Sequence, residues 1–541
     1  MKNFKFFVLL CIFASSAFAG VNLKNGNFHI TYTDIVVPGG GHDLIIERTY
    51  NSRSPDKGWF GFGWGSDYET YLNVSADGSV VIHENGSGAK TRFVPNKSVD
   101  AEAAAKKIID AMRKKNSISE TVASSLITKL TNDAELRQAY AKRFDVSAKL
   151  AVGSELYSNE RGLQKVVKTK DGYSRKYNDG KEHLFNDDGK LTKITDKNGY
   201  VVDLNYSGNN LKSIKDSMAK QIFFQWYPDG KIKSVESGAG KKTEYVYKED
   251  DLIEAKDIAG NVFKYDYDHN HNMLAINYKD GSAMKIKYTK KTQFVEEVTK
   301  KNGESVAYQY ESNPKNPEFH YWTLVTKKNP GGKDVTNRYE YEIKRKPDGS
   351  HYTYRILTVV NNVSTETIYT ECCSLPKQIK RGNFVTNFEY NSKGLLVKKN
   401  SSRGDYVELK YHPEFNKITN VSNNNGWTKF EYDKKGNLKR AENSKNMSVL
   451  LTYDSKGRIS NMYDFDKSTN KKRELSFIYN AQGKPVEISM KNIGKINVKY
   501  DNYGEILKVE SKAGHKMALQ VTQAFQSLLS IVKPAGVNLN M

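Results

Sequence analysis

Cysteine, proline and long apolar runs are all scarce in this chain. Its 541 residues include 3 cysteines and 12 prolines, against 39 glycines and 34 tyrosines. Three cysteines are too few for a disulfide scaffold or a cysteine-rich zinc site. After the N-terminal segment no run of about 18 apolar residues occurs, so no transmembrane helix is expected. The composition instead favours many short strands joined by glycine turns.

The N-terminal segment MKNFKFFVLLCIFASSAFAG has the parts of a secretory signal peptide. Two lysines precede a short apolar run, and small residues follow that run. The sequence therefore predicts a signal peptide over residues 1–19, cut between Ala19 and Gly20. We expect the mature protein to be exported to the periplasm, the cell surface or the surrounding medium.

The chain is basic, with a formal net charge of +22. Such a charge could attract acidic polymers of a cell envelope or anionic lipid headgroups. The lysines are spread along nearly the whole sequence, however, and this distribution is typical of solvated strand faces and protected sheet edges. No specific binding of nucleic acid is expected.

Cys372 and Cys373 are the only cysteines outside the signal peptide. Adjacent cysteines can close only a strained ring, so a disulfide between them would be easily reduced. The sequence leaves three states open for this pair: a vicinal disulfide, free or buried thiols, or a metal or redox role. It offers no obvious further zinc ligands at fixed spacing.

Two local patterns resemble sites of chemistry but have simpler interpretations. Asp266, Asp268, His269 and His271 lie close together in YDYDHNHN, where Asp, Asn and His also suit the backbone angles of a turn. The run 86–91 resembles a phosphate loop, but Ala89 interrupts the required residues. No nucleophile elbow is present. We expect no enzyme activity, no cofactor and no metal site.

A repeated phrase is the most informative feature that is present. In FEYDKKGNLKR and LTYDSKGRIS the phrase aromatic-x-Tyr-Asp-x-x-Gly-x-aliphatic occurs twice, with Tyr432 and Tyr453 separated by 21 residues. Aromatic residues before a turn recur at steps of 20 to 22, with one step of 26, in two series. The first series is Phe185, Tyr206, Tyr227, Tyr247, Tyr267, Tyr288 and Tyr310, and the second is Tyr390, Tyr411, Tyr432, Tyr453, Tyr479 and Tyr500.

A period of about 21 residues indicates one β-hairpin per unit. Each unit holds two short alternating runs separated by turn residues, and two turns leave strands of about six to eight residues. Because one hairpin cannot bury its own face, neighbouring units are expected to stack, with their tyrosines side by side in a ladder. The repeat is therefore predicted to be a structural unit of the fold and not a duplicated active site.

The pattern divides the chain into consecutive parts. The prediction is a β domain at 20–97, a helical insertion at 98–150, repeats at 151–310, an irregular β segment with the cysteine pair at 311–380, further repeats at 381–512, and a terminal helix and tail at 513–541. The insertion lacks glycine and proline from 98 to 144, and helix starts are expected at Ser98, Ser117 and Thr131.

The terminal helix is predicted from a stripe of apolar residues. This stripe consists of Val521, Phe525, Leu528, Leu529 and Val532. The helix is expected to dock on the β body, and the alternative is that it engages a partner or a membrane.

The repeats resemble the YD repeats of the bacterial Rhs family, which are related to those of teneurins and of insecticidal toxin-complex shells. The resemblance rests on the stretch 173–206 and on the repeated phrase at 430–460. Upstream, residues 33–95 are similar to the conserved domain that precedes YD repeats in Rhs proteins, through RTYNS, GFGW and Asp77-Gly78. The stretch YTECCSLPKQI is similar to a Cys-Cys-x-x-Pro variant found in such arrays.

This resemblance implies a mainly β fold, a spiral of antiparallel hairpins forming a shell that can enclose a polypeptide. Such shells end in a core with an Asp-Pro-x-Gly-Leu motif, followed by a toxin domain. This chain contains no Asp-Pro dipeptide, so the core and the toxin are not expected.

The expected role is structural, encapsulating or surface-interacting, without catalysis. The partner would be a polypeptide or an envelope component of unknown identity, and the oligomeric state is left open. The alternatives are a binding module for carbohydrate or acidic polymers of the envelope, and a component of a toxin or secretion system that acts with a separately encoded partner.

Overall fold

The computed structural model describes most of the chain. The described residues are 18–38, 43–86, 88–95, 99–115, 118–158, 164–177, 179–196, 199–329, 331–346, 349–371, 374–481, 483–501 and 506–532. Most of the predicted signal peptide and the pair Cys372 and Cys373 lie outside the described residues, so both predictions stand as made.

A small N-terminal unit, here called the plug, comprises the first six strands. β1 (Phe18–Asn22), β2 (Asn27–Val37), β3 (Leu44–Asn51) and β6 (Trp64–Gly65) form an antiparallel sheet in that order, while β4 (Lys57–Gly58) pairs with β5 (Gly61–Phe62). The short helix η1 (Asp67–Glu69) follows. The predicted cleavage site between Ala19 and Gly20 lies within β1.

In the described part of the chain, the strands from β7 onward form one antiparallel sheet of 36 strands, paired in chain order. Its first part comprises β7 (Tyr71–Val74), β8 (Val80–Glu84), β9 (Ala89–Pro95), β10 (Glu155–Ser158), β11 (Gln164–Thr169), β12 (Gly172–Tyr177), β13 (Glu182–Phe185), β14 (Leu191–Thr195), β15 (Val201–Ser207), β16 (Asn210–Asp216), β17 (Gln221–Trp226), β18 (Ile232–Ser237), β19 (Lys242–Lys248), β20 (Asp251–Lys256), β21 (Val262–Tyr267), β22 (Met273–Tyr278), β23 (Ala283–Tyr288) and β24 (Val295–Thr299).

A middle part spans the segment that the sequence marked as irregular. It comprises β25 (Ser305–Ser312), β26 (His320–Lys328), β27 (Val335–Arg345), β28 (His351–Val360), β29 (Val363–Tyr369) and β30 (Pro376–Arg381). Most of these strands are longer than their neighbours, which removes the period of 21 while the pairing continues without interruption.

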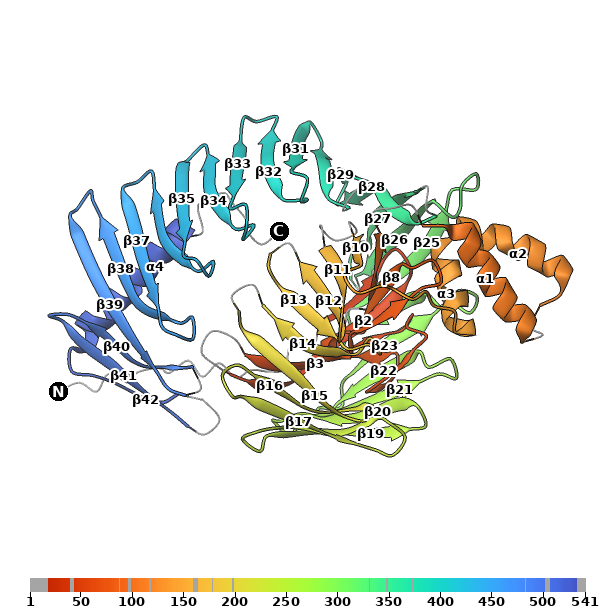
Figure 1. Cartoon of the computed structure of the whole chain (residues 1–541), viewed down its shortest axis with the longest axis horizontal. Coiled ribbons are helices and arrows are strands. Elements are labelled where there is room, and N and C mark those ends of the chain that lie inside the picture. Colours follow the sequence, from red (N-terminus) through yellow and green to blue (C-terminus); the bar gives the residue numbers. More distant parts are fainter. Residues whose placement is uncertain are drawn as a thin grey trace.

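The last part of the sheet returns to short hairpins. It comprises β31 (Phe384–Tyr390), β32 (Leu396–Ser401), β33 (Tyr406–Tyr411), β34 (Ile418–Asn423), β35 (Gly426–Tyr432), β36 (Leu438–Asn443), β37 (Met447–Tyr453), β38 (Ile459–Asp466), β39 (Lys471–Tyr479), β40 (Pro485–Met490), β41 (Gly494–Tyr500) and β42 (Ile506–Ser511). Figure 1 shows the sheet winding through a wide arc from β14 to β42. The predicted mainly β spiral of hairpins is confirmed.

The helical insertion projects from one side of the β body (Figure 1). It consists of α1 (Ala101–Lys114), α2 (Glu120–Asn132) and α3 (Ala134–Phe144). Each helix begins three residues later than the sequence predicted. For α1 and α3 the reason is that Asp100 and Asp133 accept the capping hydrogen bonds from Ala103 N and Leu136 N. No described helix is long and apolar enough to cross a membrane.

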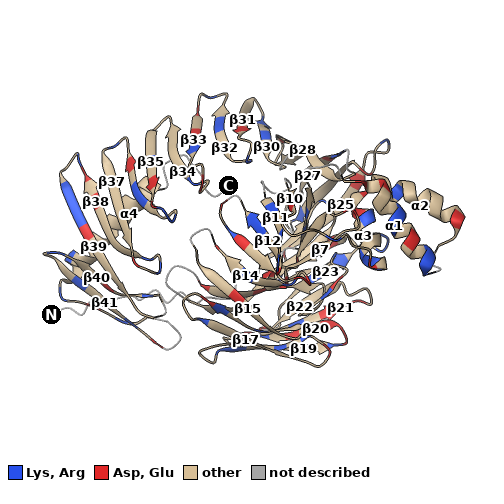
Figure 2. Ribbon diagram, viewed as in Figure 1, with Lys and Arg blue, Asp and Glu red and all other residues tan. Residues whose placement is uncertain are grey.

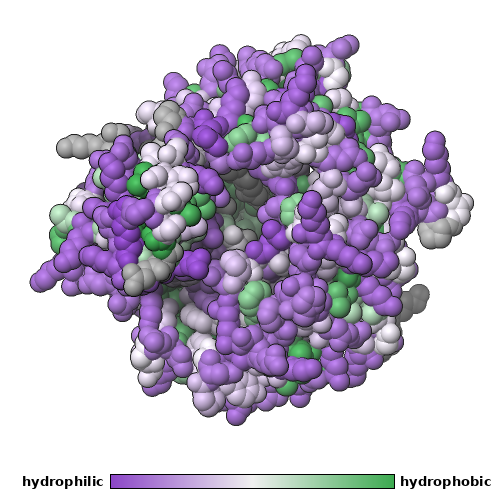
Figure 3. All heavy atoms as spheres, turned by 90° about the vertical axis from the view of Figure 1, so that its right-hand side faces the viewer, coloured by the Kyte–Doolittle hydropathy of each residue, from purple (hydrophilic) through white to green (hydrophobic). Residues whose placement is uncertain are grey.

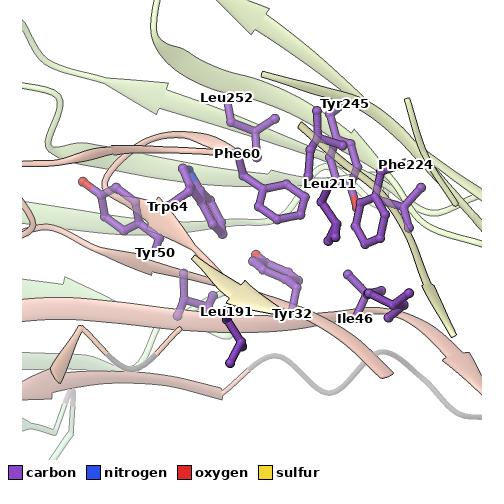
Figure 4. Close-up of a cluster of buried hydrophobic side chains, with 14 of the residues drawn as sticks. Tyr32, Ile46, Tyr50, Phe60, Trp64, Leu191, Leu211, Phe224, Tyr245 and Leu252 are labelled. Atoms are coloured by element: carbon purple, nitrogen blue, oxygen red, sulfur yellow. The ribbon is translucent and has the colours of Figure 1, made fainter. Parts of the chain in front are cut away.

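The two faces of the sheet differ in what covers them. We call the face that carries the repeat tyrosines the inner face. The plug packs on the inner face of β14 to β24, and its aromatic rings meet those of the repeats, as in Tyr32 with Phe263 at 5.0 Å and Phe60 with Tyr245 at 5.1 Å. Figure 4 shows Phe60 of the plug between Trp64 on one side and Leu211 and Tyr245 of the array on the other.

A buried ion pair lies at the centre of this contact. Arg48 Nε donates to Asp34 Oδ2 at 2.8 Å, and the two side chains are only 1% and 4% exposed. The Asp34 carboxylate also accepts from the Tyr245 hydroxyl, and Arg48 Nη2 donates to Tyr265 Oη at 3.0 Å. Burial raises the pKa of Asp34, although the Arg48 charge opposes that rise. Through the bonds to Tyr245 and Tyr265, this pair within the plug joins the plug to the array.

Helix α4 (Gly514–Val532) covers the inner face at the other end of the array. It contacts β36 to β42, and its buried residues are Met517, Ala524 and Ile531. Val521, Leu528 and Val532 of the predicted stripe pack against the same cluster. Phe525 and Leu529 of that stripe are 37% and 50% exposed, because the buried line of the helix runs through Met517, Ala524 and Ile531 and these two residues lie to one side of it.

The buried pair generates a stability prediction. Replacing Arg48→Leu leaves the Asp34 carboxylate buried without its cation, so we expect a loss of about 3–5 kcal/mol in the unfolding free energy of the plug and its repeats. Urea unfolding followed by tryptophan fluorescence measures this loss. Lys106→Leu is the control, since its ion pair with Glu102 is exposed and screened by solvent, so the unfolding midpoint should stay at the wild-type value. Equal midpoints for the two variants would contradict the role of the buried pair.

Candidate functional site

The repeat tyrosines hold successive hairpins together through one recurring hydrogen bond. The Tyr453 hydroxyl donates to the Leu438 carbonyl at 2.7 Å, across a sequence separation of 15 residues. The same bond with the same separation is made by Tyr206, Tyr247, Tyr267, Tyr288, Tyr310, Tyr411 and Tyr500. Tyr390, Tyr432 and Tyr479 make it across separations of 14, 14 and 20 residues.

One predicted marker needs correction. The Tyr227 hydroxyl donates forward to the Tyr245 carbonyl at 3.3 Å. The ladder position is filled instead by Trp226, whose indole Nε1 donates to the Leu211 carbonyl at 2.8 Å across 15 residues. An indole N–H and a phenol O–H can both donate from the end of a large flat ring, so the two residues are interchangeable here.

The remaining residues of the repeated phrase build its turn. Asp433 Oδ1 accepts from the backbone N–H groups of Lys435 and Asn437, and Gly436 adopts φ +80°. Asp454 and Gly457 repeat this geometry in the next unit. Each Asp therefore closes a turn and each Gly supplies the left-handed backbone that the turn requires.

Burial keeps the tyrosine hydroxyls in their donor form. It raises the pKa of both Tyr432 and Tyr453 to about 12. These groups therefore remain protonated at neutral pH, which suits a structural bond and not acid or base chemistry.

The run Asp266 to His271 is the end of strand β21, which holds Asp266, followed by the predicted turn. His271 has φ +62°, stacks on Phe62 with ring centroids 4.2 Å apart, and lies with Nδ1 2.9 Å from Asp251 Oδ1. Asp268 Oδ1 accepts from the backbone N–H groups of Asn270 and Asn272. These contacts seat the plug against a repeat turn.

A charged cluster that no sequence motif predicts lies on the outer face. His320 Nε2 lies 2.9 Å from Glu340 Oε1, and these residues with Glu342 could bring three ligand atoms together. Arg355 Nη1 is 2.6 Å from Glu342 Oε1, and Arg338 Nη2 is 2.8 Å from Glu340 Oε2. Two guanidinium groups thus already neutralise the carboxylates, which favours an ion-pair network. The strand register alone brings these residues together, so no local motif could have revealed them.

The helical insertion carries a hollow between its helices. The hollow has a volume of about 530 Å³ and is lined by Met112, Lys115, Ile118, Ser119, Val122, Leu126, Tyr140, Arg143 and Phe144. Its walls combine apolar side chains with the polar groups of Lys115, Ser119 and Arg143. Figure 3, which views the molecule from the side of the insertion, shows a surface that is mainly hydrophilic with small separate hydrophobic groups.

A strip of the inner face belongs to neither buried cluster. The cluster under the plug reaches Tyr308, and the cluster under α4 begins at Leu396. Between them the inner face of β28 to β31 presents half-buried threonine, isoleucine and tyrosine side chains. By register these include Ile356, Thr358, Thr365, Thr367, Ile379, Thr386 and Tyr390. This strip is the candidate functional surface.

Comparisons with known proteins give one family match. The profile of a family described as a domain of unknown function, DUF6531, matches residues 19–93. No curated protein matches the chain.

Several solved structures are similar to the chain at 10% sequence identity. They include the crystal structure of TcdB2-TccC3-Cdc42, with a TM-score of 0.42, covering 91% of this chain and 28% of that chain. TcdB2-TccC3 without its hypervariable C-terminal region gives a TM-score of 0.40 with the same coverage. A Photorhabdus luminescens Tc holotoxin pore gives a TM-score of 0.37, covering 89% of this chain and 29% of that chain. The chain spans less than a third of the length of these structures.

The tyrosine ladder generates a second prediction. Tyr453→Phe removes one hydroxyl and leaves the Leu438 carbonyl without its donor, so we expect a loss of about 0.5–1.5 kcal/mol in unfolding free energy. Chemical unfolding measures it. Tyr406→Phe is the matched control because its side chain lies on the outer face and is 39% exposed, so its effect should stay within about 0.5 kcal/mol. The prediction fails if the two variants cannot be distinguished.

Proposed function

We propose that this chain is an exported protein of the Rhs type, whose YD repeats form a shell-like scaffold. The repeated Tyr-Asp-x-x-Gly phrase and its recurring hydrogen bond support the repeat assignment. The N-terminal phrases of the plug and the pattern of a signal peptide support the family and the export. The scaffold acts by binding and not by catalysis, because its conspicuous polar residues have structural partners.

The bound molecule proposed is a polypeptide, held on the strip between the plug and α4. The strip is concave, as the arc of the sheet in Figure 1 indicates, and its side chains combine apolar and hydroxyl groups. Ile356 stands opposite Tyr341 and Thr367 on this face. Such a surface can contact an extended chain through side chains while hydroxyl groups satisfy its polar atoms.

An acidic polymer of the envelope was the alternative suggested by the net charge. Figure 2 shows basic and acidic residues interspersed over the array, and many of them form ion pairs. This arrangement gives the polymer no particular region to prefer, so the polypeptide remains the better supported ligand.

Site-specific photo-crosslinking tests the proposal in native cells. A benzoyl-phenylalanine is placed at Ile356 on the inner face or, as a matched control, at the neighbouring Leu357 on the outer face. We expect a crosslinked polypeptide of defined mass from Ile356 and none from Leu357, with the protein outside the cytoplasm and beginning at Gly20. Equal crosslinking from both positions, or none from either, would contradict a polypeptide on the inner face.

A further inference from the structure

The two ends of the array differ in the hydrogen bonding of the outer edge of their terminal strand. At the first end, Tyr71 of β7 bridges to Lys190, and Leu72 N donates to the Gly189 carbonyl at 2.8 Å. The edge of β7 is therefore joined to the turn before β14. Unpaired strand edges readily recruit another strand, and this contact protects the first one.

Among the described residues, the outer edge of the last strand, β42, has no such contact. In the described part of the chain β42 pairs with β41 alone. Figure 2 places β7 near β14 and β23, whereas Figure 1 places β42 at the opposite side of the molecule. Helix α4 crosses the inner face and does not add a strand beyond β42.

Exposed aliphatic side chains concentrate on this edge. Ile506 is 62% exposed, Leu507 is 68% exposed and Val509 is 57% exposed, and Leu507 is the most exposed of the large hydrophobic side chains in the described residues. Val509 stands opposite Val498, and Ile506 stands opposite Tyr500, so both lie on the inner face. A row of apolar residues on an open edge is a surface that favours burial by a further strand.

The ladder identifies what is missing at this edge. Tyr432 pairs with Leu438 across a bulge, and the Leu438 carbonyl then accepts from the tyrosine of the next strand, Tyr453. Tyr500 pairs with Ile506 across the same kind of bulge. By this register the Ile506 carbonyl is the next acceptor of the ladder. No described side chain donates to it. The residue 15 positions further on, where the ladder spacing would place the next tyrosine, is Val521, which lies in α4.

We propose that the outer edge of β42 binds a β-hairpin of another polypeptide that carries the same tyrosine repeat. The incoming strand pairs antiparallel with β42, its apolar inner face covers Ile506 and Val509, and its tyrosine hydroxyl donates to the Ile506 carbonyl. A second copy of this chain fits less well. Antiparallel pairing of β42 with its own copy brings Glu510 and Ser511 near Ile506 and supplies no tyrosine. The inference is independent of whether the strip on the inner face binds a polypeptide.

A hairpin peptide tests this site on the full chain. The probe is a fluorescent synthetic peptide with the sequence of residues 426–443, which carries Tyr432 and both strands of one repeat. Fluorescence anisotropy measures its affinity for the wild-type protein. We expect Val509→Lys to weaken binding at least about tenfold, because the charge would be buried under the added strand. Ile478→Lys is the matched control, since Ile478 is 54% exposed on the outer face of an interior strand, and it should leave the affinity within about twofold.

The tyrosine contact is tested within the peptide itself. A peptide with Tyr432→Phe should bind about three- to tenfold more weakly if the hydroxyl completes the ladder at Ile506. Equal affinity for Val509→Lys and Ile478→Lys, or no binding at millimolar peptide, would overturn the site. Dimerisation of the wild-type chain that Val509→Lys abolishes would assign the edge to a second copy and overturn the proposed partner.

Discussion

The hydrogen bond from a repeat tyrosine to a carbonyl of the preceding hairpin governs the architecture of this protein. Each bond contributes only about 1 kcal/mol, but it also fixes which tyrosine faces which carbonyl. A slip of one residue would turn every side chain of a strand to the other face. The ladder thus helps to hold the register of successive 21-residue units, and most units use the same two groups, a tyrosine hydroxyl and a backbone carbonyl.

The ladder leaves the inner face apolar, and the chain covers that face with two unrelated elements. The plug contributes aromatic rings and the pair Arg48 and Asp34 to the first half of the array. Helix α4 contributes an apolar stripe to the second half. Neither element has the form of a repeat, and each meets the repeats at their tyrosine side. The strip between them is where the inner face stays accessible.

Much of the fold could be predicted from the sequence because the repeat is local. A hairpin has its turn and both strands within one period. Residues such as Asp433 and Gly436 therefore predict the turn at their own position. The position of the plug could not be predicted, since Asp34 meets Tyr245 across 211 residues and no short pattern encodes that contact. Tyr227 fits the period of the repeat, but the adjacent Trp226 supplies the donor, and the spacing of aromatic residues cannot distinguish two neighbouring rings. Phe525 and Leu529 fit the apolar pattern of α4, but the pattern cannot show that the buried line runs through Met517, Ala524 and Ile531.

The contacts of Arg48 and Asp34 with tyrosines of the array also constrain the order in which the protein can fold. Arg48 and Asp34 are made early in synthesis, yet their partners Tyr265 and Tyr245 follow 217 and 211 residues later. Until those tyrosines are available, the aromatic rings of the plug have no surface to cover them and must remain exposed to water or to a chaperone. Contacts so distant in sequence are slow to form. The plug is therefore the first part of the chain to be synthesised, but its contacts around Arg48 and Asp34 cannot be complete until β19 and β21 have been made.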